Sequence, residues 1–264
     1  MKISVIGCGN MASAIIGGIL AAGFANAEDI TASDKYEAAR EKAGKAFGIK
    51  TTGDNKECVR GAELVLFAIK PNVFPEAGAE LADVITDGQL VLSIMAGKTI
   101  ATLEAVLGAD KKIVRAMPNT PALVGEGITG YCPNRNVADE ELAVCADLIS
   151  SFSEAEQVPE SLMGVVTSVS GSSPAYVYMF IEAMADAAVA DGMPRAQAYH
   201  FAAQTVLGSA KMVLETGKHP GELKDMVCSP GGTTIEGVVT LEQMGFRSAV
   251  IEAVRACTEK ALNM

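Results

Sequence analysis

The feature that most constrains this chain is a glycine-rich turn placed directly after its first apolar segment. Residues 3–6 read Ile-Ser-Val-Ile, and residues 7–12 read Gly-Cys-Gly-Asn-Met-Ala, which fits the pattern G-x-G-x-x-A. In such a turn Gly7 makes the tight bend, Gly9 lets the backbone approach a pyrophosphate, and Ala12 permits close packing of helix on strand. The first N–H groups of the following helix then face the phosphates. This placement favours a dinucleotide site over an ordinary strand-to-helix turn.

Short apolar runs alternate with helical patterns through the first part of the chain. The predicted strands are residues 3–6, 30–32, 63–69, 89–95 and 112–115, and helices between them include residues 11–22, 36–47 and 100–107. Continuous apolar runs are typical of strands buried on both faces, as in a parallel sheet covered by helices. The alternation predicts the fold class, an α/β doubly wound sheet of Rossmann type with right-handed crossovers.

The pattern changes after about residue 155, and from residue 160 onward it predicts helices alone. The clearest are residues 176–190 and 195–215, with Pro194 expected at the first helical position and Gly217 as a C-cap. Residues 198–213 are apolar on more than one face, which predicts burial in a bundle or a subunit interface. The predicted domains are therefore residues 1–158, which bind the dinucleotide, and residues 159–264, which are all-helical.

Composition excludes several classes of protein. A net charge of −11 argues against nucleic-acid binding, which needs clustered Lys and Arg. Six scattered cysteines and two histidines show no zinc-ligand spacing, so no metal is expected. We expect no signal peptide and no membrane-spanning segment, and cysteines that stay reduced in the cytoplasm.

The end of the second predicted strand should meet the ribose of the cofactor. Asp34 follows Ala12 by 34 − 12 = 22 residues, about where an acid that binds the 2′-hydroxyl of NAD is expected. Ser33 and Lys35 offer a hydroxyl and an ammonium to the 2′-phosphate of NADP instead. Equally, Asp34 is suited to capping the next helix, so the residues alone leave NAD and NADP open.

Donor-rich loops suggest where a substrate binds. Residues 229–234 read Ser-Pro-Gly-Gly-Thr-Thr before a helical segment, and their N–H and O–H groups suit a small carboxylate. Residues 170–176 are also rich in hydroxyls, but a serine N-cap with a proline in the first turn accounts for them equally well. His200 and His219 lie outside these loops, which disfavours a dehydrogenase that needs a histidine base. A protonated imine needs less assistance, because it already accepts hydride well.

Several segments together resemble one family. These are residues 7–11 (GCGNM), 68–71 (AIKP), 115–121 (RAMPNTP), 170–176 (SGSSPAY) and 225–234 (DMVCSPGGTT). The chain is similar over nearly its whole length to pyrroline-5-carboxylate reductases, and the last segment is the most specific. The resemblance implies NAD(P)H-dependent reduction of 1-pyrroline-5-carboxylate to L-proline, the last step of proline biosynthesis. It also implies a homodimer or higher homo-oligomer with active sites at the dimer interface, and it favours NADP(H) over NAD(H).

The resemblance also implies individual roles. Thr234 would hydrogen-bond the ring nitrogen as the catalytic candidate, and the substrate carboxylate would lie on Ser229, Gly231, Gly232 and Thr233. The implied cofactor contacts are Ile6, Gly7, Cys8, Gly9, Asn10, Met11, Ser33, Asn55, Ala68, Ile69, Lys70, Pro71, Met95, Ala96 and Gly97.

Two alternatives stay open beside this interpretation. A β-hydroxyacid dehydrogenase has a similar layout but carries a catalytic lysine on the helix that opens its second domain, roughly where Tyr176 stands here. A protein that senses NAD(P) without turnover would not need the small-anion loop at residues 229–234.

Overall fold

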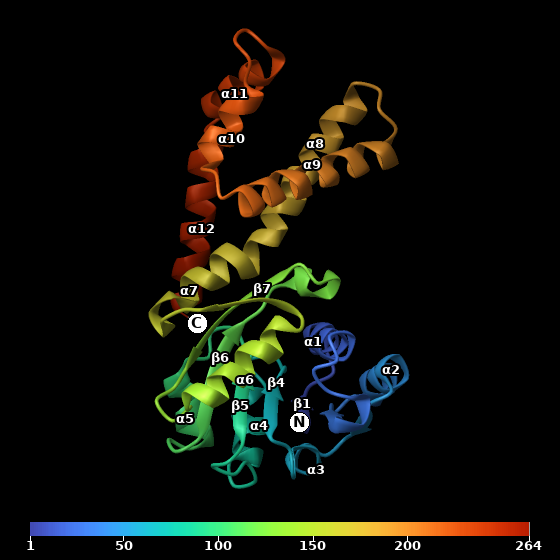
Figure 1. The fold of residues 1–264 in the computed structure, drawn as a ribbon, viewed down its shortest axis with the longest axis vertical. Helices are drawn as coiled ribbons and strands as arrows, with labels where there is room; N and C mark the ends of the chain where they lie inside the picture. The colour runs from blue at the N-terminus through green and yellow to red at the C-terminus, as the bar shows by residue number, and fades with distance from the viewer. Residues whose placement is uncertain (264) are drawn as a thin grey trace. The chain divides into compact units, whose positions relative to one another are not determined.

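The computed structural model describes residues 1–263 and divides into two compact units. The first unit is Met1–Ser172 with the end of the chain from Cys257, and the second is Ser173–Ala256. In Figure 1 the first unit contains the sheet and the second consists of helices. The domain boundary predicted between residues 158 and 159 lies inside the first unit.

The first unit is built on one eight-stranded sheet in the order β3-β2-β1-β4-β5-β6-β7-β8. The strands from β1 to β6 run parallel, whereas β7 is antiparallel to β6 and parallel to β8. The order 3-2-1-4-5-6 is that of dinucleotide-binding sheets, so the predicted fold class is confirmed. The strands are β1 Ile3–Ile6, β2 Ile30–Ser33, β3 Lys50–Thr52, β4 Leu64–Phe67, β5 Leu90–Ser93, β6 Lys112–Met117, β7 Gly127–Pro133 and β8 Ser153–Gln157.

Three of these strands were not predicted from the sequence, because none of them contains an apolar run. β3 is only three residues long and reads KTT. β7 begins with Gly127 and ends with Pro133, which are poor strand formers. β8 reads SEAEQ at the edge of the sheet, where polar residues keep a strand from pairing further.

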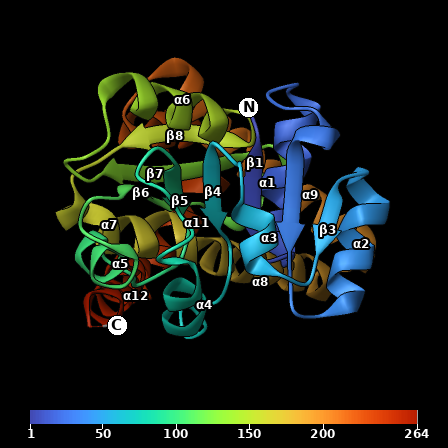
Figure 2. The same cartoon turned by 90° about the horizontal axis from the view of Figure 1, so that it is seen from below.

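Helices cover both faces of the sheet, and each face has its own apolar core (Figure 2). One core joins the strands to α1, α2 and α6, and the other joins them to α3, α4 and α5. The helices of this unit are α1 Asn10–Ala21, α2 Glu37–Phe47, α3 Asn55–Val59, α4 Phe74–Leu81, α5 Ile100–Leu107, α6 Asp139–Ser150 and α7 Met163–Val166. Short 3₁₀ turns are η1 Ala27–Asp29, η2 Thr120–Val124 and η3 Glu160–Leu162, and the π-helix η4 is Thr167–Ser172.

The second unit contains helices alone, as predicted. They are α8 Ser173–Ala190, α9 Arg195–Thr216, α10 Pro220–Val227, α11 Thr233–Gln243 and the start of α12 Phe246–Leu262. Gly217 ends α9 with a left-handed φ of +63°, as expected of a C-cap. Pro194 was predicted one residue too far inside: it is the N-cap, and α9 begins at Arg195.

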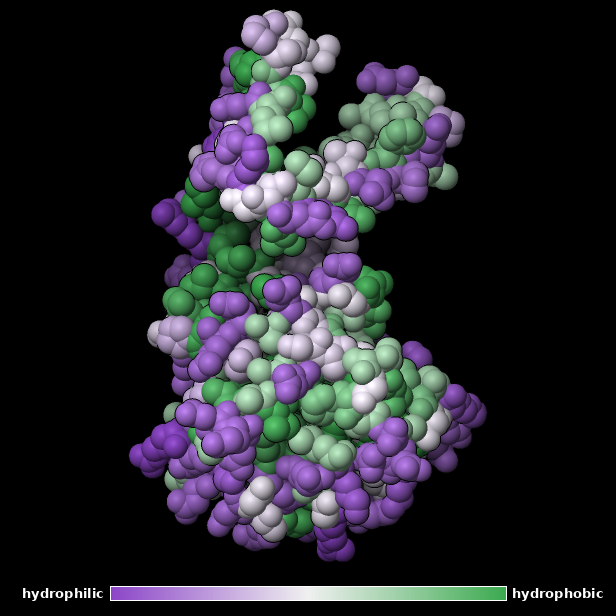
Figure 3. All heavy atoms as spheres, in the orientation of Figure 1, coloured by the Kyte–Doolittle hydropathy of each residue, from purple (hydrophilic) through white to green (hydrophobic). Residues whose placement is uncertain are grey.

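The second unit has little apolar core of its own. Among its described residues, the buried hydrophobic ones are three alanines, Ala185, Ala198 and Ala202. Large apolar side chains are instead exposed on these helices, including Phe201 at 55 % and Leu207 at 52 %. Figure 3 shows hydrophobic residues at the surface of these helices between polar ones. Such a surface is typical of an interface.

One predicted helix start is wrong. The hydroxyl-rich residues 170–176 are predicted to open a helix, but the backbone is already helical there, because α7 runs into the π-helical segment Thr167–Ser172 and then into α8. The Ser170 hydroxyl donates back to the carbonyl of Val166 at 2.8 Å. Short π-helical segments within longer helices occur frequently at functional sites.

Candidate active site

The glycine turn after β1 is held between the ends of two neighbouring strands. Gly7 has a φ of +107°, and its N–H donates to the carbonyl of Ser33 at 2.7 Å. A Cβ on Gly7 would stand 2.7 Å from the carbonyl oxygen of Ala68, at the end of β4. Both the backbone conformation and this close approach therefore require glycine.

The N-terminus of α1 is left open toward solvent. Its N-cap is Gly9, which has no side chain to accept from the first N–H groups, and the first turn carries no acidic residue. A Cβ on Gly9 would meet no atom of residues 1–263 within 4 Å. By contrast, Asp54 caps α3 and Thr99 caps α5. The first turn of α1 thus fits the pyrophosphate of a dinucleotide, which would accept from its N–H groups and meet the positive end of the helix.

The end of β2 carries the groups predicted to meet the ribose. The Ser33 hydroxyl donates to Asn55 Oδ1 at 2.7 Å. Asp34 Oδ2 accepts from the N–H of Cys8 at 2.9 Å, and Oδ1 accepts from that of Tyr36 at 2.9 Å. Because Tyr36 is the N-cap of α2 and makes no side-chain cap, the capping role considered for Asp34 is wrong. Its carboxylate joins the end of β2 to the glycine turn through Cys8 and to the N-cap residue of α2 through Tyr36.

Electrostatics at this turn follow from burial and from Asp34. Burial, reinforced by the Asp34 carboxylate, raises the pKa of the Cys8 thiol to about 11. The thiol is therefore protonated at neutral pH and is no nucleophile.

Two further loops follow strands at the same edge of the sheet. β4 leads into residues 68–71, and the N–H of Ala68 donates to the carbonyl of Ile6 at 2.9 Å. β5 leads into residues 94–99, where Met95 is buried and Gly97 has a φ of +72°. Because β1, β2, β4 and β5 are parallel, all of their carboxyl ends meet at one edge, where ligands of such sheets bind. The structure thus brings the predicted cofactor residues together within the first unit.

The predicted substrate loop lies in the second unit, between α10 and α11. Gly231 has a φ of +64°, and the N–H of Gly232 donates to the carbonyl of Ser229 at 3.0 Å. Gly232 is the N-cap of α11, and a Cβ there would collide with Ser229 Oγ. The loop therefore wraps tightly around an uncapped helix start, an arrangement that suits a small anion.

Two sets of polar interactions in residues 115–121 (RAMPNTP), those of Asn119 and Arg115, were not predicted from the sequence. Asn119 accepts from the N–H of Ile128 at 3.0 Å and donates to the carbonyl of Ser170 at 3.1 Å. Arg115 forms an ion pair with Glu160 at 3.0 Å. The signal available was the presence of Arg and Asn in an otherwise apolar strand end, where a polar group must have a partner.

Neither histidine belongs to the glycine turn or to the predicted substrate loop. His219 is exposed at the N-cap of α10, where its Nδ1 accepts from the N–H of Gly221 at 3.0 Å. His200 is exposed on α9 in the single chain. Within residues 1–263 no group of three His, Cys, Asp or Glu side chains is placed to hold a metal ion, and none of the helices has the length and hydropathy to cross a membrane.

An open sheet of this order with a free glycine-turn helix start defines an NAD(P)-dependent oxidoreductase. Accordingly, residues 2–97 match the family described as NADP oxidoreductase, coenzyme F420-dependent, and residues 160–264 match pyrroline-5-carboxylate reductase dimerisation. The chain belongs to the pyrroline-5-carboxylate reductase family.

Individual relatives cover essentially the whole chain. It is 52 % identical over 264 residues to a pyrroline-5-carboxylate reductase of Escherichia coli, covering 98 % of this chain and 97 % of the relative. It is 45 % identical to one of Methanosarcina acetivorans, covering 98 % and 96 %. A crystal structure of Plasmodium falciparum pyrroline carboxylate reductase with NADP bound is similar with a TM-score of 0.91 at 33 % identity, covering 100 % of this chain and 97 % of that one.

Proposed function

We propose that this chain reduces the C=N bond of 1-pyrroline-5-carboxylate and yields L-proline, with NADPH as the reductant. The observation that carries the proposal is the presence of two glycine-capped helix starts without a side-chain cap, that of α1 in the first unit and that of α11 in the second. One suits a dinucleotide pyrophosphate and the other a small carboxylate. Together with near full-length similarity to relatives of this name, they describe an enzyme rather than a cofactor sensor.

The cofactor is assigned to the strand ends of the first unit. The backbone from Ile6 to Met11 would cradle the pyrophosphate, and Ser33, with Asn55 behind it, would meet the ribose. Met95, Ala96 and Gly97 would border the nicotinamide, and Ala68, Ile69, Lys70 and Pro71 would lie between. Similarity to an enzyme with NADP bound supports NADPH over NADH.

The substrate is assigned to the loop before α11. The N–H groups of Ser229, Gly231, Gly232 and Thr233 would hold its carboxylate, and the hydroxyl of Thr234 would hydrogen-bond the ring nitrogen. When bound, NADPH supplies the hydride that reduces the C=N carbon. The protein then needs only to orient the ring and deliver a proton to nitrogen, so a histidine base is unnecessary.

The assembly is a homodimer or a larger homo-oligomer of this chain. The second unit belongs to a dimerisation family and exposes large apolar side chains that a second copy would cover. We place the enzyme in the cytoplasm, because its six cysteines are free thiols, as expected in a reducing compartment.

The direct test is a spectrophotometric assay. Purified protein is mixed with 1-pyrroline-5-carboxylate, and the loss of NADPH or NADH absorbance at about 340 nm, the nicotinamide band, is followed. We expect turnover with both and a higher kcat/KM for NADPH. Thr234→Ala should lower kcat about 10²-fold, as is typical of removing a positioned proton donor, whereas Thr240→Ala, on the same helix, should leave it unchanged. No turnover by folded, dimeric protein would overturn the proposal.

A further inference from the structure

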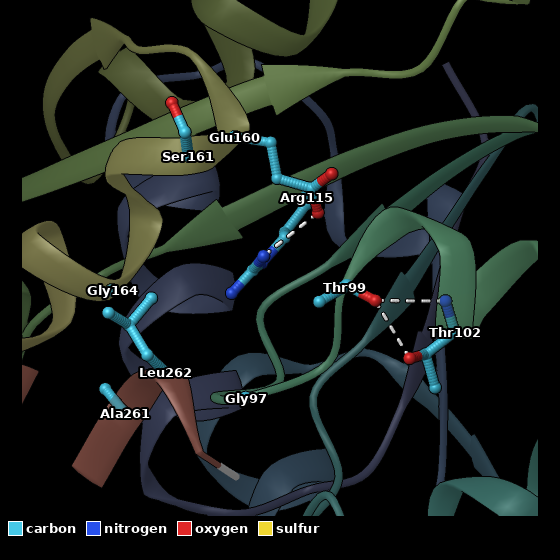
Figure 4. Close-up of a pocket in the computed structure, with 9 residues that line it drawn as sticks. All are labelled: Gly97, Thr99, Thr102, Arg115, Glu160, Ser161, Gly164, Ala261 and Leu262. Atoms are coloured by element: carbon cyan, nitrogen blue, oxygen red, sulfur yellow. Dashed lines mark hydrogen bonds and ion pairs between the residues drawn. The ribbon is translucent and has the colours of Figure 1, made fainter. Parts of the chain in front are cut away.

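A cavity of about 400 Å³ lies in the first unit beside the loop that follows β5. Figure 4 shows Arg115 extending into it from β6 and Glu160 meeting it from η3. Gly97 and Thr99 of the β5–α5 loop form another part of its wall, and Gly164 and Leu262 complete it. None of these residues has a role in the assignments above except Gly97.

Arg115 brings a buried charge to this cavity. Its side chain is only 9 % exposed, and a buried guanidinium is stable only when it is paired and hydrogen-bonded. Its Nη1 donates to Glu160 Oε1 at 3.0 Å. Glu160 is 45 residues further along the chain, so the pair joins the sheet to the segment that precedes α7.

The same oxygen of Glu160 makes a second bond. Oε1 also accepts from the N–H of Ile100 at 2.7 Å, and Ile100 is the first residue of α5. Thr99 caps the N–H of Thr102 at 3.1 Å. Glu160 and Thr99 thus satisfy two of the N–H groups that a helix start leaves open, and the carboxylate also meets the positive end of the helix. Because Glu160 already neutralises Arg115 and holds α5, an anion entering the cavity would have to displace it.

The two ends of the β5–α5 loop are fixed in different ways, one by the sheet and the other by this pair. Arg115 is the register partner of Ser93, the last residue of β5, in the parallel sheet. At the other end Glu160 holds Ile100. The loop between them is residues 94–99 and contains the three residues assigned to the nicotinamide. Gly97, with its positive φ, lies in the cavity wall itself.

We propose that Arg115 and Glu160 are positioning residues. They fix the β5–α5 loop in the position relative to the nicotinamide that hydride transfer needs. The proposal rests on the proposed function, because that function assigns the loop to the nicotinamide. Neither side chain reacts with the substrate; Glu160 acts through the N–H of Ile100, and Arg115 acts through Glu160. Misplacing a reacting group by about 1 Å costs up to about 10² in rate, so releasing one end of the loop should lower kcat far more than the affinity for the rest of the cofactor.

The test compares Glu160→Gln with Glu154→Gln, an identical change at an exposed residue of β8. The glutamine keeps the size of the side chain but removes the charge that pairs with Arg115. We expect kcat to fall about 10- to 10²-fold and the fluorescence of bound NADPH to change. The Kd of 2′,5′-ADP, a probe without nicotinamide, should stay within about twofold of wild type. Glu154→Gln should match wild type in all three measurements.

A double-mutant cycle shows whether Arg115 and Glu160 affect kcat as a pair or independently. Arg115→Met combined with Glu160→Gln should cost no more in kcat than the more damaging single change, since each already breaks the pair. Arg115→Lys, which keeps the charge, should recover part of kcat. Circular dichroism and Tm identify any variant that fails to fold.

Two outcomes would overturn the inference. One is wild-type kcat and wild-type NADPH fluorescence in Glu160→Gln. The other is an equal loss of affinity for NADPH and for 2′,5′-ADP, which would mean general destabilisation. If wild-type protein did not reduce 1-pyrroline-5-carboxylate, the proposed function would fail, while the fluorescence comparison would still test the position of the loop.

Discussion

The two glycine loops of this protein each place two glycines before a helix, but they differ in how they are supported. Gly7 is buried, and a Cβ there would stand 2.7 Å from the Ala68 carbonyl oxygen. Gly231 is exposed, and a Cβ there would meet no described atom within 4 Å. Both have a positive φ, +107° and +64°. The cofactor loop is therefore fixed by its own sheet, whereas the substrate loop depends on its own turn alone within the described chain.

The same difference extends through both units. The sheet has two apolar cores filled by large side chains such as Phe67, Phe74 and Ile15. Among the described residues of the second unit, the buried apolar ones are three alanines. Apolar burial is the main stabilising term in folding. The first unit thus buries its own apolar core, and we expect association with another copy to stabilise the second.

Breaking that association should produce the largest effect. Leu207→Glu places a charge on an apolar side chain of α9 that is 52 % exposed in the single chain and that we expect a second copy to bury. Burying an unpaired carboxylate costs several kcal/mol, so the dimer should dissociate at micromolar concentration and activity should be lost. Sedimentation or light scattering measures the mass, and the NADPH assay measures activity.

Gln197→Glu, at the start of the same helix, is the matched control and should leave the dimer intact. If Leu207→Glu stayed dimeric and active, the exposed face of α9 would not be the contact between subunits, and the second unit would need another source of stability.

The two glycines provide a sharper, intermediate test. Gly7→Ala introduces a collision with backbone as well as a strained φ, so we expect the Kd of NADPH to rise at least about tenfold and Tm to fall by several degrees. Gly231→Ala introduces strain of about 1 kcal/mol without a collision. It should raise KM for the substrate while leaving the Kd of NADPH unchanged. Equal losses of NADPH affinity in both variants would contradict the separation of the two loops.

Local sequence patterns predicted the part of the fold whose apolar core lies within one chain. The five apolar runs became β1, β2, β4, β5 and β6, and the helix at residues 100–107 was placed correctly at both ends. The polar edge strand β8 could not be predicted, because its position is set by pairing with β7 rather than by its own residues. The π-helical segment before α8 was mistaken for a helix start because it is rich in serine, which is typical of N-caps, whereas the Ser170 hydroxyl donates to the Val166 carbonyl of a continuing helix.

The candidate site likewise contains residues that the local sequence predicts and others whose contacts form only in the folded chain. Gly7 and Gly9 could be recognised because glycine at these positions has a local cause. The bonds of Asp34 could not, since the N–H of Cys8 reaches it only after β1 and β2 pair. Arg115 was visible as a charge in a strand, but its partner Glu160 is brought near only by the folded sheet.

The smallest expected effect concerns the buried thiols of the first unit. Burial raises the pKa of Cys132 to about 11 and that of Cys145 to about 12, from an ordinary value of 9.0. Above pH 9 these thiols ionise in the unfolded chain but stay protonated in the folded one, so the unfolded state binds fewer protons. The free energy of unfolding should therefore fall as pH rises above about 9, by up to about 1.4 kcal/mol per pH unit for each thiol.

Urea unfolding at pH 8 and pH 10 measures this fall, and a variant isolates the thiol from other alkaline effects. Cys145→Ala removes a fully buried thiol of the first unit and should lose less stability between the two pH values than wild type does. Val144→Ala, the neighbouring position on α6, keeps the Cys145 thiol and should lose as much as wild type. Identical losses in all three proteins would show that the Cys145 thiol ionises as readily in the folded protein as in the unfolded chain. The interior around α6 would then be accessible to water, and the contrast between a closed first unit and an open second one would have to be given up.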